Sequence, residues 1–319
     1  MEIIDRLRSL TSRLNNKLWI FLKLGISILL LVYAVSVIDF QKLKQSISIL
    51  DFKILFLAII FGLIQVLINS ITQQRFFYIL GEKLFFWKNY SHNLIGSFYG
   101  FLLPSTVGSD LYFTNYFSKE FTSLKKAMVG VVFIRLAGLL MFFVFIIFFA
   151  LTIRTSLAGV LIKENYEKVI SIVLVIILFA GILYFLFRKR LNSHLADIFE
   201  LTKKVFNNKK ELSAVLFLIF LWNLFSISGR IYFARSIGID LNIFSMAFTI
   251  LLVNFILMLP ISLSGIGLRE ISYIGLLGLS GIPSEKAFLL SLIDFSILIS
   301  GVIVGSSILL IKSIKNARN

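Results

Sequence analysis

Long apolar stretches alternate with short polar and basic segments along the whole chain. An α-helix rises about 1.5 Å per residue, so about 20 apolar residues are needed to cross the hydrocarbon core of a bilayer. Stretches of this length predict membrane-spanning helices at 18–38, 53–72, 126–153, 168–187, 213–235 and 285–311. The pattern is typical of an all-α polytopic membrane protein with about six full spans.

Two further apolar segments, near 90–118 and 241–281, are interrupted by proline, at Pro104 and at Pro260. Proline lacks the backbone N–H and disfavours helix at the residue before it, so we expect two short helices joined by a break in each segment. Lipid cannot hydrogen-bond the backbone groups freed at a break, which therefore has to be buried in protein or line a polar cavity. Breaks at corresponding places in two halves of a chain are typical of a transporter's binding site.

The composition supports a membrane protein and narrows the chemistry. Hydrophobic residues make up 58% of the 319 residues, and 32 Lys and Arg outnumber 16 Asp and Glu. The cations lie mostly between the apolar stretches, where they would face anionic lipid headgroups rather than nucleic acid. The chain has no cysteine, only the histidines His92 and His194, and no P-loop motif. We therefore expect no metal site and no cofactor.

The distribution of Lys and Arg predicts the topology. The segment 188–210 and both termini are rich in these residues, and basic loops stay on the cytoplasmic side. All three can be cytoplasmic only if each proline-containing segment is re-entrant, returning to the side from which it entered. We then expect a single multi-pass domain, 1–319, in the cytoplasmic membrane. Each half, 1–160 and 161–319, would contain three spans and one re-entrant hairpin, which predicts an inverted repeat.

Several ionisable residues fall within the apolar segments instead of the loops. A charge at membrane depth costs several kcal/mol unless it is paired or hydrated, so each one is a candidate functional residue. Asp110, Arg135, Arg269, Glu270 and Asp294 lie within or beside the broken segments or in the helices that follow them. One interpretation is structural: Arg135 pairs with Asp110, and Arg269 pairs with Glu270 or Asp294.

The other interpretation is a binding site for a phosphate group. New helices that start near Ser109 and Gly267 would direct their N-termini to the interior, and helix N-termini attract anions. Neighbouring residues on a helix point about 100° apart, so we expect Glu270 to face Arg135 instead of Arg269. The predicted substrate-binding residues are Arg135, Arg269, Ser105, Gly108, Ser264, Gly265 and Gly267. The residues predicted to pair charges or to couple transport to protons are Asp110, Glu270 and Asp294, and none is predicted to be catalytic.

Polar residues elsewhere in the spans have simpler explanations. Arg230 and Arg235, near the end of a span, are expected to extend their side chains to the headgroups. Asn93 and Gln73 either line the cavity or form hydrogen bonds between helices.

Two sequence motifs carry a resemblance to a known family. The first is Leu103-Pro104-Ser105-Thr106-Val107-Gly108-Ser109-Asp110, and the second runs from Ser262 to Glu270 and reads Ser-Leu-Ser-Gly-Ile-Gly-Leu-Arg-Glu. Both are similar to motifs of the lysylphosphatidylglycerol synthase transmembrane-region family, also called flippase-like. The second motif is intact, whereas serines replace two glycines of the first, and Thr114 stands where arginine is common. The resemblance covers nearly the whole chain.

The resemblance implies a module that moves lipids across the membrane. In multidomain relatives it translocates an aminoacylated phospholipid that a separate cytoplasmic domain has made, and other relatives are linked to lipid-linked sugars. Because the sequence ends at Asn319, we expect neither a synthase domain nor aminoacyl transfer. The implied cargo is a phosphate-bearing lipid: a phospholipid, an aminoacylated phospholipid or a polyprenyl-linked glycan.

Two classes of function stay open at this point. A transporter would carry the headgroup through a polar groove between the hairpins while the lipid tails stay in the bilayer. An integral membrane transferase would act on a lipid headgroup or a lipid-linked sugar, and it would need a carboxylate base or metal-binding acids. The intramembrane acids are scattered along the sequence, which favours the transporter. The expected partners are membrane lipids, with a separate lipid-modifying enzyme as a further candidate; no nucleic acid is expected, and the oligomeric state is open.

Overall fold

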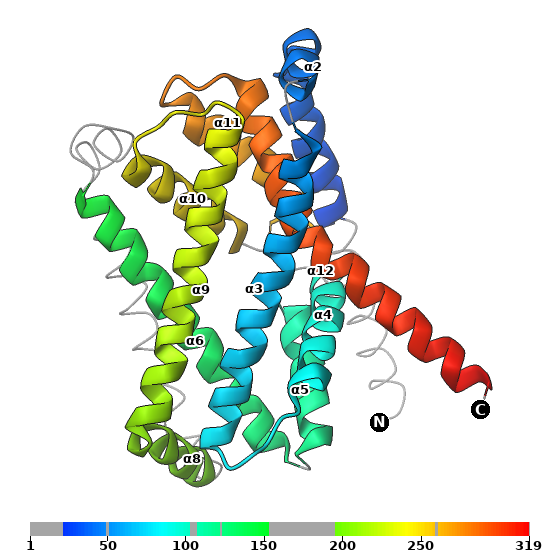
Figure 1. Cartoon of the computed structure of the whole chain (residues 1–319), viewed down its shortest axis with the longest axis vertical. Helices are drawn as coiled ribbons and strands as arrows, with labels where there is room; N and C mark the ends of the chain where they lie inside the picture. The colour runs from blue at the N-terminus through cyan, green and yellow to red at the C-terminus, as the bar shows by residue number, and fades with distance from the viewer. Residues whose placement is uncertain are drawn as a thin grey trace, which may run out of the picture.

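The computed structural model describes residues 22–48, 51–102, 107–121, 123–152, 195–258 and 261–318. Within these ranges every regular element is a helix, as the all-α prediction requires. Helix Leu22–Ser36 comes first. It is followed by α2 (Phe40–Ser48), α3 (Phe52–Ile79), α4 (Phe86–Leu102), α5 (Val107–Glu120), α6 (Leu124–Thr152), α8 (Leu195–Asn207), α9 (Lys209–Ser236), α10 (Ile243–Met258), α11 (Leu268–Gly278) and α12 (Ser284–Arg318) (Figure 1).

Four long helices form the frame of the bundle. α3, α6, α9 and α12 are each long and apolar enough to cross a membrane, and the bent pair of the first helix and α2 could form a fifth span. The chain is therefore a multi-pass membrane protein. The predicted span 168–187 lies outside the described residues, so the count of six full spans stays a prediction.

Several helix boundaries differ from the predicted ones, among them those of α3 and of the first helix. α3 continues to Ile79, seven residues beyond the predicted end, because Gln73 and Phe76 are buried and keep the helix packed against its neighbours. The first span was expected over 18–38, but the helix ends at Ser36 and the chain turns by 88° into α2. Polar residues thus do not end a helix when they find partners inside the bundle.

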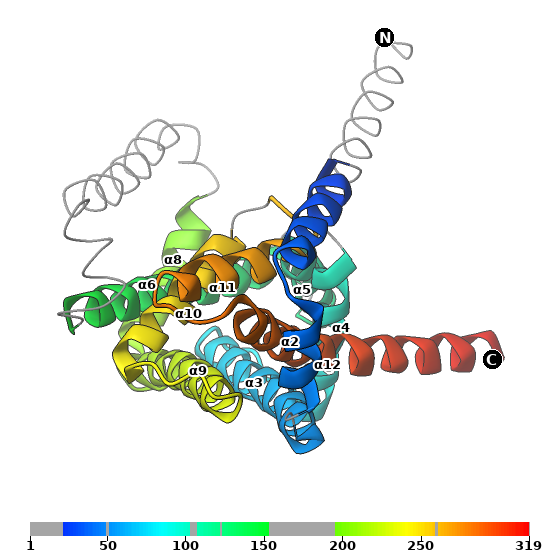
Figure 2. The ribbon, with the colours of Figure 1, turned by 90° about the horizontal axis from the view of Figure 1, so that it is seen from above.

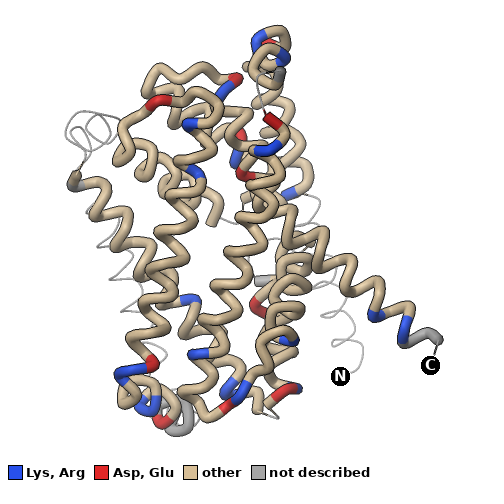
Figure 3. The backbone as a smooth tube through the Cα atoms, in the orientation of Figure 1, with Lys and Arg blue, Asp and Glu red and all other residues tan. Residues whose placement is uncertain are grey.

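The segment 188–210 is not the simple loop that the sequence predicts. Its described part contains α8, an amphipathic helix in which Leu201 and Val205 are buried while Lys203 and Lys204 are exposed. In the tube view, charged residues gather near the two ends of the bundle, and α8 lies at the lower end (Figure 3). The lysines therefore lie on a surface helix, as expected for a segment at a membrane surface.

The two proline-containing segments form helix pairs, as predicted. α4 packs along α5 and α10 packs along α11; we call these pairs hairpin 1 and hairpin 2. α3 and α6, which flank hairpin 1, run in opposite directions, so hairpin 1 begins and ends at the lower end of the bundle in Figure 1. Hairpin 2, flanked by α9 and α12, begins and ends at the upper end. This opposite orientation is what an inverted repeat requires, and the repeat halves 1–160 and 161–319 stay a prediction.

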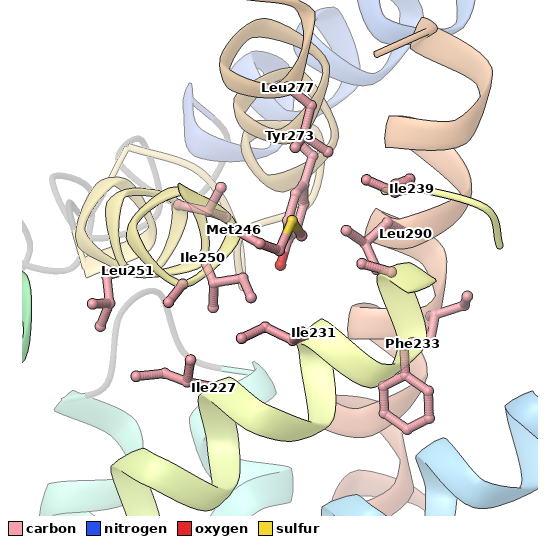
Figure 4. Packing of buried hydrophobic residues seen from close by; sticks show 14 of the residues in the cluster. Ile227, Ile231, Phe233, Ile239, Met246, Ile250, Leu251, Tyr273, Leu277 and Leu290 are labelled. Atoms are coloured by element: carbon pink, nitrogen blue, oxygen red, sulfur yellow. The ribbon is translucent and has the colours of Figure 1, made fainter. Parts of the chain in front are cut away.

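Each hairpin packs on its own hydrophobic cluster. Around hairpin 2, side chains that include Ile250, Tyr273 and Leu290 meet between α9, α10, α11 and α12 (Figure 4). Around hairpin 1 the cluster combines aliphatic and aromatic side chains, and the ring centroids of Phe77 and Phe117 lie 4.4 Å apart. Because lipid tails are as apolar as these side chains, close packing holds the helices together more than the exclusion of water does.

Glycines let neighbouring helices approach α12 closely. A Cβ added at Gly305 of α12 would overlap the Leu94 carbonyl oxygen of α4, and one added at Gly62 of α3 would overlap the Ile297 carbonyl oxygen of α12. α12 therefore contacts α3, α4 and α11, and in the view from above it passes between them before its C-terminal part projects outward (Figure 2).

Candidate functional site

Hairpin 2 turns at a glycine-containing break that leads directly into α11. Ser264, Gly265 and Gly267 have positive φ angles of 53°, 80° and 79°. Gly267 also has a steric reason to be glycine, because a Cβ there would lie 2.6 Å from the Ser27 carbonyl oxygen. The Leu263 N–H donates to Ser27 Oγ at 2.8 Å. The break is therefore packed against the first described helix.

Glu270 caps the N-terminus of α11. Its carboxylate accepts a hydrogen bond from the Gly267 N–H at 2.7 Å, and its side chain is buried. The positive end of the helix is thereby partly neutralised by the helix's own residue. The prediction that Glu270 faces Arg135 is wrong, because a carboxylate at this position reaches back to the N-cap without crossing to another helix.

Arg269, in the first turn of α11, joins Arg230 of α9 and Asp294 of α12 in what we call the buried ion-pair cluster. Arg230 Nε donates to Asp294 Oδ1 at 2.6 Å, and Arg269 Nε lies 3.4 Å from Asp294 Oδ2. The three side chains are 12%, 5% and 2% exposed in the order Arg230, Arg269 and Asp294. Of the two structural pairs considered for Arg269, the structure has the one with Asp294.

Arg230 does not reach the headgroups as the sequence predicts. Its Nη1 donates to the Ser226 carbonyl oxygen at 3.1 Å, one turn earlier on α9, while its Nε is bonded to Asp294. Arg235, five residues later, is exposed. A buried carboxylate on the neighbouring helix therefore holds Arg230 inside the bundle, where desolvation would otherwise expel it.

The buried ion-pair cluster has more donors than acceptors. Two guanidinium groups face one carboxylate, which leaves a net charge of +1. Arg269 Nη1 is buried and has no hydrogen-bond partner within the described part of the chain. The Arg269 guanidinium also lies over the Phe295 ring, 5.5 Å from its centroid. An unbonded buried donor costs about 1–3 kcal/mol, so an oxygen-rich anion here would satisfy groups that the protein leaves unpaired.

The two hairpins touch where the breaks lie. Ser264 Oγ donates to the Phe101 carbonyl oxygen, which is in the last turn of α4 and has no partner within that helix. A Cβ added at Gly265 would lie 3.5 Å from Arg269 Nη2, so the guanidinium group lies beside the break. The predicted binding residues of hairpin 2 are thus brought together around Arg269. Of those in hairpin 1, Gly108 is buried at the start of α5, and Ser105 lies outside the described residues.

Hairpin 1 carries its own ion pair. Arg135 Nη1 of α6 lies 3.6 Å from Asp110 Oδ1 of α5, and the two side chains are 40% and 33% exposed. The pair matches the structural interpretation of the sequence. Both side chains keep part of their surface accessible, so the protein buries this pair less than the buried ion-pair cluster.

Side-chain amides join hairpin 1 to α3. Asn93 Oδ1 accepts from Asn69 Nδ2 at 3.1 Å, and Asn93 Nδ2 donates to Gln73 Oε1 at 2.6 Å. Asn89 Nδ2 donates to the Ser70 carbonyl oxygen at 2.9 Å. These amides form hydrogen bonds between helices, which is one of the two roles that the sequence leaves open for Asn93 and Gln73.

Arg230 is the site residue that the sequence analysis misplaced. The residues that follow it, Ile-Tyr-Phe-Ala, are still apolar or aromatic, which is a signal that the arginine lies inside the span rather than at its end. Its partner Asp294 follows it by 64 residues, and only the packing of α9 against α12 brings them together.

Comparison with known proteins identifies the family. The model of the lysylphosphatidylglycerol synthase transmembrane region matches residues 20–305, which include both broken segments and the buried ion-pair cluster. No curated protein and no solved structure matches the chain at a significant level. The match covers most of the chain, and the chain therefore belongs to the lysylphosphatidylglycerol synthase transmembrane-region family.

Proposed function

We propose that the protein translocates a phosphate-bearing lipid across the cell membrane. The observation that carries this proposal is the buried ion-pair cluster, which has a net positive charge and an Arg269 Nη1 without a hydrogen-bond partner in the described chain. A phosphate group is an acceptor-rich anion that a guanidinium group can bind through two parallel hydrogen bonds. Membership of a lipid-related membrane family supports the same substrate class.

The headgroup would pass between the two hairpins, and the tails would stay in the bilayer. The Ser264–Phe101 hydrogen bond joins the hairpin tips beside Arg269, and in our proposal this arrangement is the closed state of the site. Opening of this contact would admit the phosphate to Arg269, and its reclosure from the other side would release it. This scheme needs only two arrangements of the hairpins around a fixed site, as in other transporters with broken helices.

The alternative, transfer of a group to the lipid, receives less support from the geometry. Asp294 is bonded to Arg230, Glu270 caps α11, and Asp110 is paired with Arg135. A general base has to be free to take a proton from the reacting group. Each of these three carboxylates already has a protein partner, which favours binding and transport of the headgroup over chemistry on it.

Reconstituted transport tests the proposal. Purified variants in proteoliposomes would be assayed for translocation of a fluorescent phosphatidylglycerol between leaflets. A charged hydrogen bond lost from the site is expected to slow translocation at least about tenfold in Arg269→Ala, with a smaller loss in Arg269→Lys, which keeps the charge without the planar fork. Arg235→Ala is the matched control, because Arg235 is exposed on α9. Wild-type translocation by a well-folded Arg269→Ala variant would contradict the proposal.

We also propose that both termini and α8 lie on the cytoplasmic side, because the lower end of the bundle carries the lysines of α8. The chain has no cysteine, so Asn207→Cys introduces a single label at the end of α8. A membrane-impermeant maleimide should not label this variant in sealed right-side-out vesicles; labelling before lysis would reverse the orientation.

A further inference from the structure

A second polar cluster joins hairpin 1 to the last part of α12. It contains His92 of α4, Tyr112 and Tyr116 of α5, and Lys312 of α12. Lys312 follows Asp294 by 18 residues on the same helix, which is about 27 Å along its axis. The cluster is therefore distinct from the buried ion-pair cluster.

Ring stacking fixes the positions of the polar atoms in this cluster. The His92 and Tyr116 rings are stacked with centroids 3.7 Å apart and planes 11° apart. Tyr99 stacks on Tyr112 in the same way, with centroids 4.8 Å apart. The aromatic hydroxyl groups are thus held in place by the packing of α4 on α5 and not by solvent.

The hydrogen bonds of His92 determine which atoms carry protons. Lys312 Nζ lies 3.5 Å from His92 Nε2, and His92 Nδ1 lies 2.5 Å from the Tyr112 hydroxyl oxygen. A lysine ammonium group can only donate, so Nε2 accepts and the imidazole proton is on Nδ1. Nδ1–H then donates to the Tyr112 oxygen, which leaves the Tyr112 hydroxyl hydrogen free to be donated to another group.

The hydroxyl group of Tyr116 also has a hydrogen without an acceptor. The Tyr116 hydroxyl is buried and has no hydrogen-bond partner within the described chain, and the residue is only 8% exposed. Glu120, one turn later on α5, would be the nearest acceptor by sequence, but both of its oxygens accept from Lys88 Nζ, at 2.9 and 2.7 Å. Among the described residues, no carboxylate lies within ion-pair distance of Lys312. The cluster therefore presents the unpaired Tyr116 hydroxyl, the Tyr112 hydroxyl hydrogen that His92 leaves free, and an ammonium group that donates to the neutral His92 ring but has no counter-charge among the described residues.

We propose that His92, Tyr112, Tyr116 and Lys312 form an anion site that binds a phosphate group at hairpin 1. A phosphate group supplies acceptor oxygens for both hydroxyls and a negative charge for Lys312, whereas a neutral or cationic ligand would leave the lysine without a counter-charge. His92 fixes the positions of Lys312 and Tyr112, because each of its ring nitrogens contacts one of them. The phosphate belongs either to a lipid headgroup or to a free phosphate ion.

Lipid binding to the full-length protein tests this site. Native mass spectrometry would measure the affinity for phosphatidylglycerol and for diacylglycerol with the same tails, which lacks the phosphate. Every protein would carry Arg269→Ala, so that binding at the buried ion-pair cluster does not contribute and the proposed transport function is tested separately. We expect phosphatidylglycerol to bind and diacylglycerol not to bind at this site.

Two substitutions remove the proposed contacts without disturbing the packing. Tyr116→Phe deletes only the unpaired hydroxyl, and Lys312→Gln deletes the charge; each should weaken phosphatidylglycerol binding roughly tenfold. Lys315→Gln is the control, because it removes the same charge from the exposed next turn of α12 and should change binding less than about twofold. Melting temperatures equal to that of the parent protein show that the variants are folded.

Competition with inorganic phosphate separates the two sources of the ligand. Displacement of phosphatidylglycerol from the parent protein by phosphate, and no such effect in Tyr116→Phe, would identify a site for the free ion as well as the headgroup. Resistance to phosphate with loss of binding in Tyr116→Phe would identify a headgroup site. Unchanged phosphatidylglycerol and phosphate binding in both Tyr116→Phe and Lys312→Gln, or an equal loss in Lys315→Gln, would overturn the proposal.

Discussion

Hairpin 1 and hairpin 2 have the same arrangement of helices but differ in how deeply their charged residues are buried. Each begins a new helix after a proline-containing break, and each carries an acid or an arginine close to that break. In hairpin 1 the Asp110–Arg135 pair keeps more than a third of its surface open on average, with 3.6 Å between Arg135 Nη1 and Asp110 Oδ1. In hairpin 2, Arg269 and its partner Asp294 are at most 5% exposed. One hairpin thus holds a partly accessible pair and the other a pair that is buried in protein.

The two hairpins are also anchored by different interactions. Hairpin 1 is tied to α3 by amide hydrogen bonds through Asn93 and to α12 by the close approach at Gly305. Hairpin 2 is packed in an apolar cluster with α9 and α12. A partly accessible ion pair opens at less cost than a buried pair, which is costly to break. We therefore expect the buried ion-pair cluster to stay fixed while contacts of hairpin 1 rearrange around it.

The largest expected effect is on stability, from neutralising the central carboxylate. Asp294→Asn leaves two buried guanidinium groups without a counter-charge, which should lower the free energy of unfolding by about 3–5 kcal/mol. Asp110→Asn is the matched change in hairpin 1, and a half-exposed pair should contribute less than about 1 kcal/mol. Thermal unfolding in detergent, followed by size-exclusion chromatography, measures both. Equal destabilisation by the two substitutions would remove the distinction between the hairpins.

The next effect concerns the contact between hairpin 1 and α12. Gly305→Ala places a methyl group on the Leu94 carbonyl oxygen, and overpacking of this kind costs about 1–3 kcal/mol. Gly275→Ala on α11 is the control, because nothing lies within 4 Å of the added Cβ. It should be neutral or stabilise the helix by up to about 1 kcal/mol. The same thermal assay distinguishes them, and a neutral Gly305→Ala would show that α4 can move away from α12 freely.

The smallest expected effect is on coupling to protons, which we assign to the partly accessible Asp110–Arg135 pair. Glu270 is occupied as a helix cap, and glutamine can keep that hydrogen bond, so Glu270→Gln should preserve any response to a pH gradient. Asp110→Asn should abolish this response. In the wild-type protein we expect the pH gradient to change the translocation rate roughly fivefold. Lipid translocation in proteoliposomes, with and without an imposed gradient, measures the response. A wild-type rate that ignores the gradient would make passive scrambling the better description.

The sequence predicts the broken hairpins and their charges because proline, glycine and intramembrane charge act locally. The break before Leu268 and the half-helices on either side of it follow from short stretches of sequence, and the pair of Arg135 with Asp110 was one of the two interpretations left open. The sequence does not predict which residues that lie far apart along the chain pair with each other in the fold. Arg230 was expected at the headgroups, and its burial depends on Asp294 of another helix. Glu270 was expected to face Arg135 of another helix, but its carboxylate caps the N-terminus of its own helix.

The sequence also does not show which hydrogen-bond donors are unpaired in the fold. Arg269 Nη1 and the Tyr116 hydroxyl are notable only because the surrounding packing leaves them without acceptors. A serine, tyrosine or arginine in a span usually finds a neighbour, and only the three-dimensional arrangement shows which one does not. Both proposed phosphate sites therefore rest on hydrogen-bond accounting in the folded chain rather than on motifs.

Cross-linking the hairpin tips tests most directly whether the headgroup passes between the hairpins. Phe101→Cys combined with Ser264→Cys puts one thiol on each of the two residues that the hydrogen bond from Ser264 Oγ to the Phe101 carbonyl oxygen joins, in a chain with no other cysteine. A short bifunctional thiol reagent that forms reducible disulfides should stop translocation of fluorescent phosphatidylglycerol in proteoliposomes, and reduction should restore it. Gly275→Cys combined with Leu279→Cys, a pair at the end of hairpin 2 away from the tips, should transport normally when cross-linked. Full translocation by the cross-linked tip variant would contradict passage of the headgroup between the hairpins.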